Sequence, residues 1–152
     1  MTDTKTTLSK EEQEAKFKDW YQSEYVRISK HCSSQGYSIR NFDQKQSRLL
    51  PPILGVWYIK TMQKNLDLWV VSGDFPVDIA GAKVAKDARE AIRYFSMTWQ
   101  MKAAKLEDGI SEGKITMVDE QTQTKYIADL TKRAEHLYDL QATDKLWENA
   151  DL

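Results

Sequence analysis

The sequence has little of what disulfide and metal sites require. Among its 152 residues there are one cysteine, two histidines and three prolines. The single cysteine, Cys32, excludes an internal disulfide and a cluster of thiolate ligands. The histidines, His31 and His136, are far apart in the chain, and neither belongs to an HxxxH or HxxE motif, which argues against a zinc site. We therefore expect no metal and no cofactor.

Long apolar runs are also missing. The longest, PPILGVWYI at residues 51–59, is much shorter than the roughly 18 residues that a membrane helix needs. The N-terminal residues are polar and lack the apolar core of a signal peptide. We expect a cytoplasmic protein that does not span a membrane.

The chain has no excess of charge of either sign. Lys and Arg number 22 against 23 Asp and Glu, and both halves of the chain are balanced. Proteins that bind nucleic acid usually carry a positive excess or a basic stripe, so this balance argues against nucleic acid as the main partner. Hydrophobic residues make up 41% of the chain, enough for a core. We expect one domain over residues 1–152, with the Thr-rich residues 1–8 disordered.

Helical and β patterns alternate along the chain. Ser9 and Glu12 form a capping box ahead of a helical period over about residues 10–32. Two stretches rich in β-branched and aromatic residues, about 53–62 and 66–72, predict an antiparallel hairpin with Asn65 in its turn. Further helical periods cover about residues 79–106 and 119–141. The predicted fold is α+β, with the hairpin packed against three main helices and residues 37–52 forming an irregular connection.

The hairpin is apolar on both faces. Alternation places Trp57 and Ile59 on one face and Val56 and Tyr58 on the other. We expect either helices on both sides of the sheet or a second chain on one of them.

The stretch WVVSGDFPVD, residues 69–78, has two interpretations. Asp74 and Asp78 follow a strand and could bind a ligand or act in acid–base chemistry. Alternatively, Gly73 allows a sharp turn, Asp74 hydrogen-bonds nearby amides and Asp78 caps the following helix. We favour the structural interpretation, because it gives every residue a role. No catalytic residue is assigned.

The helix predicted over 79–106 carries two candidate binding faces. Lys86, Arg89 and Arg93 lie on one side and could bind a phosphate or an acidic partner, although such cations more often form a solvated face. Tyr94, Met97 and Met101 form a second apolar group, which either packs against the last helix or contacts another protein.

Nucleotide-binding loops and the Gly-x-Ser-x-Gly motif are absent. The segments WVVSGDFPVD and DAREAIRYFSMTWQMKA resemble a family of small bacterial proteins known only as a domain of unknown function. The resemblance covers about residues 50–106 and rests on Ser-Gly-Asp after the strand and on Arg93, Phe95, Ser96, Trp99 and Gln100. It implies a cytoplasmic bacterial protein and no known activity.

These observations favour a non-enzymatic protein that binds another protein or associates with itself, because aromatic residues are abundant and no catalytic set can be assembled. The alternative is a small-ligand binder or an enzyme. Its site would lie around Asp74 and Asp78, with Arg89 or Arg93 holding an anion.

Overall fold

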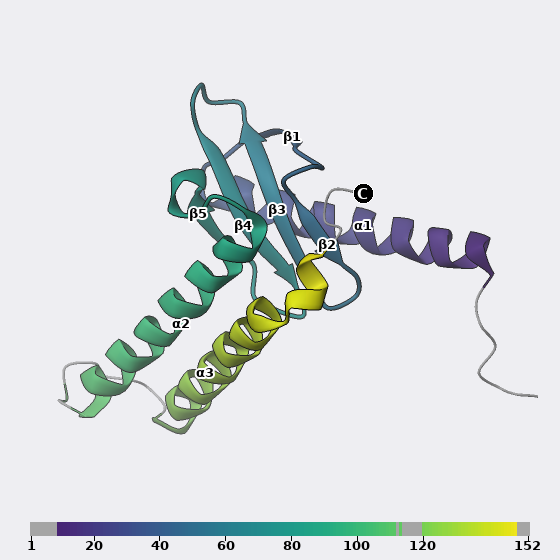
Figure 1. The fold of residues 1–152 in the computed structure, drawn as a ribbon. Coiled ribbons are helices and arrows are strands. Elements are labelled where there is room, and N and C mark those ends of the chain that lie inside the picture. Colours follow the sequence, from purple (N-terminus) through teal and green to yellow (C-terminus); the bar gives the residue numbers. More distant parts are fainter. Residues whose placement is uncertain (1–8, 112, 114–119, 149–152) are drawn as a thin grey trace, which may run out of the picture.

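The computed structural model describes residues 9–111, 113 and 120–148; the predicted disorder of residues 1–8 falls outside them. Three long helices accompany a five-stranded antiparallel sheet, which confirms the α+β class (Figure 1). None of the helices in these residues is long and apolar enough to cross a membrane. The elements are α1 (Lys10–Ser34), β1 (Ile39–Phe42), β2 (Arg48–Leu50), β3 (Leu54–Thr61), β4 (Asp67–Gly73), β5 (Asp78–Gly81), the 3-10 helix η1 (Ala82–Val84), α2 (Ala88–Ser111), α3 (Glu120–Ala142) and the 3-10 helix η2 (Asp144–Trp147).

The predicted hairpin forms the centre of the sheet. β3 pairs with β4, and Asn65 in the turn between them adopts a left-handed conformation with a φ of 62°. β5 extends the sheet beyond β4, while β1 and β2 both pair with the other edge of β3. The segment expected to be irregular therefore contains two short strands, because the free edge of β3 offers backbone groups that need partners.

Helices cover both faces of the sheet, which is one of the two arrangements that the apolar alternation predicts. Trp57 and Ile59 pack with Ile28 and Cys32 of α1. The opposite face, which includes Val56, packs against α2 and α3. Figure 1 shows α1 passing behind the sheet and extending beyond its edge, while α2 and α3 run side by side away from it. The apolar side chains on both faces of the hairpin are therefore covered by helices of the same chain.

The first helix begins as expected. The Ser9 hydroxyl accepts from the Glu12 amide, and the Glu12 carboxylate accepts from the Ser9 amide, which confirms the capping box. Cys32 near the other end is fully buried, and burial raises the pKa of its thiol to about 11. The thiol is thus a small apolar group of the core.

The second long helix starts later than predicted. It begins at Ala88, because residues 78–81 pair with β4 as strand β5 and η1 follows them. The buried indole N–H of Trp69 donates to the carbonyl oxygens of Ala82 and Ala85, at 3.2 and 3.1 Å. A continuous α-helix would use such carbonyls for its own hydrogen bonds, so satisfying Trp69 favours the irregular segment.

Candidate functional site

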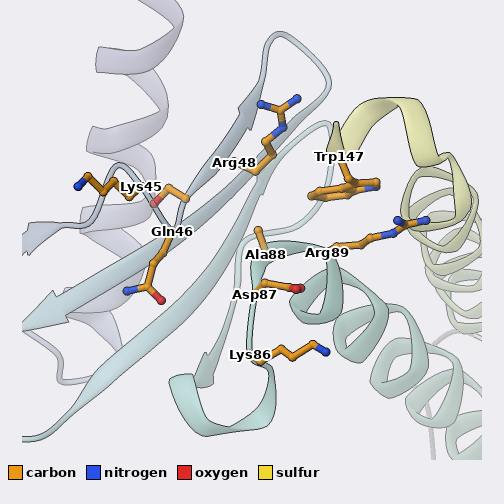
Figure 2. A pocket seen from close by; sticks show the side chains of 9 residues that line it. Lys45, Gln46, Arg48, Lys86, Asp87, Ala88, Arg89 and Trp147 are labelled. Atoms are coloured by element: carbon orange, nitrogen blue, oxygen red, sulfur yellow. The ribbon is translucent and has the colours of Figure 1, made fainter. Parts of the chain in front are cut away.

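A hollow with a basic lining lies where the edge of the sheet, the start of α2 and η2 meet (Figure 2). Its volume is about 400 Å³. We call it the basic cavity. Four of its lining residues are cationic, namely Lys45, Arg48, Lys86 and Arg89, and its walls also include Asp87 and Trp147.

The two arginines of the cavity hold the C-terminal segment in place. Arg48, on β2, donates from Nε and Nη2 to the carbonyl oxygen of Leu146, at 3.0 and 2.7 Å. Arg89, on α2, donates from Nε to the carbonyl oxygen of Gln141 at 2.8 Å, and its Nη2 pairs with Asp144. Residues almost 100 positions apart in the sequence are thereby joined into one wall.

The first turn of α2 forms the floor of the cavity. The Asp87 carboxylate caps the helix by accepting from the Glu90 amide at 2.8 Å. The amides of Ala88 and Arg89, in the first turn, have no acceptor within the helix. Trp147, whose indole N–H donates to the Leu140 carbonyl oxygen at 3.0 Å, supplies an aromatic wall nearby (Figure 2).

Several cationic groups of the cavity have N–H donors that are free to bind a ligand. The Nη1 atoms of Arg48 and Arg89 make no hydrogen bond within the described part of the chain. Lys86 is largely exposed and makes only a 3.9 Å ion pair with Glu90. Asp87, the one acidic lining residue, already serves as the helix cap. The arrangement suits a phosphate or carboxylate group, which binds to cations and to the free amides at the start of a helix.

Hydrogen bonds from side chains of the helices to backbone atoms hold the loop that contains Asp74 in place. Arg27 of α1 donates to the carbonyl oxygens of Gly73 and Phe75, both at 2.9 Å. The largely buried Glu24 carboxylate accepts from the Gly73 amide at 2.7 Å. Arg133 of α3 donates to the Asp74 carbonyl oxygen. Side chains from both layers of helices therefore fix the conformation of this turn.

The role predicted for the Asp74 side chain in the turn is wrong. Its carboxylate is exposed and accepts no hydrogen bond from the residues that the structure describes. It lines an open hollow of about 550 Å³ together with Asp129, Arg133 and His136. Ligand binding by Asp74 stays a prediction, at a place apart from the basic cavity.

The capping role predicted for Asp78 is also wrong. Asp78 lies in β5, where its carboxylate accepts from the Trp99 indole N–H at 2.7 Å and from the Ile79 amide at 2.8 Å. Asp87 caps α2 instead. Arg93 is exposed on α2. Of Asp74, Asp78, Arg89 and Arg93, only Arg89 lines the basic cavity, beside Lys86 of the same predicted basic stripe, so the structure does not bring these four together.

The residues predicted as an interface share one side of α2. Tyr94 is half-buried and its ring lies edge-on to that of Phe95, with 5.9 Å between the ring centroids. Met97 and Met101 remain 52% and 56% exposed although α3 packs beside α2. Their role in an interface stays a prediction.

Sequence reasoning missed Lys45 and Arg48 as site residues. Both lie in the segment expected to be irregular, and neither belongs to a periodic face or a motif. Trp147 lies in η2 near the end of the chain, where no local pattern indicates a cavity. The three residues meet Arg89 only through tertiary contacts, which no local pattern indicates.

Searches of curated proteins and of solved structures find no significant match. A family model matches residues 14–147, which include most of α1 and all of α3, the two long helices that the sequence resemblance did not reach. The chain therefore belongs to the family described as Domain of unknown function (DUF4826).

Proposed function

We propose that the protein is a non-catalytic binding module of the bacterial cytoplasm that takes an anionic group into the basic cavity. The observation that carries the proposal is that four cationic side chains line one hollow, whose one acidic lining residue caps a helix. Free guanidinium donors and the first amides of α2 add to the attraction for an anion. Among the ligand-binding residues predicted from the sequence, Arg89 is retained in the proposed site.

The proposal is tested by isothermal titration with tripolyphosphate and with citrate, which separate phosphate from carboxylate ligands. The double variant Lys45→Gln/Lys86→Gln removes two exposed charges without touching the arginines that hold the C-terminal segment. We expect it to bind about tenfold more weakly than the parent, because two charge-assisted contacts are lost.

Lys132→Gln is the matched control, since this exposed lysine of α3 lines a different hollow. It should bind like the parent. The proposal fails if the parent binds neither anion, or if the double variant binds as tightly as the parent.

A second candidate function is binding to another protein or self-association through α2. It is favoured by the exposure of Met97 and Met101, which follow Tyr94 at helical spacing. Sedimentation of the parent should then give a mass that rises with concentration, and Met97→Gln/Met101→Gln should remove that rise. A parent mass that stays monomeric at all concentrations contradicts self-association.

A further inference from the structure

We propose that the basic cavity is one end of a longer track that binds single-stranded nucleic acid, an inference that rests on the proposed anion site. The prediction from composition, that nucleic acid is not the main partner, counts charges along the chain. The folded structure instead gathers cations from β1, β2, β3 and the start of α2 along one edge of the sheet. A local basic stripe attracts phosphates even where the net charge is close to zero.

Shared lining residues make the track continuous. A hollow of about 410 Å³ beside the β3–β4 turn is lined by Arg40, Lys60 and Lys64. Arg40 and Lys60 also line a hollow of about 650 Å³ between α1 and β1, and Lys45 lines both this middle hollow and the basic cavity. Each of the three hollows has three or four cationic residues and a single acidic one.

The acids along the track are engaged in the fold. Asp43 accepts from the amide of Lys45 and from the side chain of Gln46, both at 2.9 Å. Asp67 accepts from the Tyr58 hydroxyl at 2.7 Å. With Asp87 acting as the helix cap, each of these carboxylates is directed to a donor of the protein itself. Among the lysines of the track, only Lys86 forms an ion pair with a described residue, so the other ammonium groups and the free guanidinium donors remain for an external anion.

Aromatic side chains beside the cations favour a nucleic acid over an acidic protein as the ligand of the track. The middle hollow is lined by Tyr21, Tyr25 and Phe42 next to its cations. The Tyr21 and Tyr25 rings are parallel, with an interplanar angle of 1°. Rings beside a basic groove are what unpaired bases stack on, whereas a duplex keeps its bases stacked on one another.

The test is fluorescence anisotropy with a labelled oligothymidylate of about 12 nucleotides, within the usual range of site sizes. If about four phosphates are contacted, log K should fall with log salt at a slope of about −3. Raising salt from about 50 to about 200 mM should then weaken binding about 60-fold. Tyr21→Leu keeps an apolar side chain and should weaken binding about fivefold or more, through lost stacking.

Variants outside the cavity separate this inference from the proposed function. Arg40→Gln/Lys60→Gln should weaken oligonucleotide binding about tenfold or more and leave tripolyphosphate binding unchanged, while Lys132→Gln changes neither. If tripolyphosphate binds but the oligonucleotide does not, the inference is wrong and the anion site stands. If neither binds, both are wrong. Tighter binding of polyglutamate than of the oligonucleotide would overturn the inference in favour of an acidic protein partner.

Discussion

Replacing Gly73 with alanine should lower the free energy of unfolding by about 4 kcal/mol or more, at the upper end of single-residue effects. Gly73 ends β4 with a φ of +99°, a conformation that costs a residue with a Cβ about 1–2 kcal/mol. A Cβ there would lie 2.3 Å from the carbonyl oxygen of Ile53 and 2.8 Å from Cα of Leu54. These are backbone atoms of the paired segment, so the sheet itself would have to move.

Movement at Gly73 would also disturb the hydrogen bonds that fix the loop after β4. Its amide donates to Glu24 and its carbonyl oxygen accepts from Arg27. The measurement is urea denaturation followed by circular dichroism. Gly36→Ala is the matched control, because Gly36 has a φ of +90° and open space around it, and should cost about 1–2 kcal/mol. Equal losses in the free energy of unfolding of the two variants would show that the close approach to Ile53 does not destabilise the Gly73→Ala protein.

Gly55→Ala should lower the free energy of unfolding by about 3 kcal/mol, which combines a lost buried hydrogen bond with overpacking. The Trp57 indole N–H donates to the Ser72 hydroxyl at 2.9 Å. A Cβ on Gly55 would lie 2.7 Å from both atoms of this bond. Trp57 and Ser72 are fully buried, so neither side chain can move aside freely.

Gly81→Ala is the control for this second substitution. Gly81 also lies in a strand, but nothing stands within 4 Å of its Cβ position. Its replacement should change stability by less than about 0.5 kcal/mol, as is usual away from packed features. Denaturation of both variants under the same conditions decides the question, and a Gly55→Ala protein as stable as Gly81→Ala contradicts the packing argument.

Elements with strong local signals could be predicted from the sequence. The capping box of α1, the central hairpin and its two apolar faces all depend on neighbouring residues or on simple alternation. β1, β2 and β5 could not be predicted, because each is short and owes its conformation to an edge that β3 or β4 offers. The late start of α2 has the same origin, since β5 and the acceptors of Trp69 use residues that fit a helical period.

The candidate site depends even more on tertiary structure. Arg89 could be named from the sequence as an anion-binding residue, because it lies on a helix with other cations. Lys45, Arg48 and Trp147 could not, since their proximity to Arg89 results from the packing of β2 and η2 around the start of α2. Asp74 and Asp78 attract attention in the sequence, yet the loop between them is positioned mainly by arginines from α1 and α3 that hold its backbone.

The most direct test of the anion site is an NMR titration of the labelled protein with tripolyphosphate, which reports where the anion binds. We predict that the largest shifts occur at the backbone amides of Ala88 and Arg89, with a shift of the Trp147 indole N–H, because these groups line the basic cavity. Shifts confined to the Asp74 loop, or no shifts at any concentration, would contradict the account.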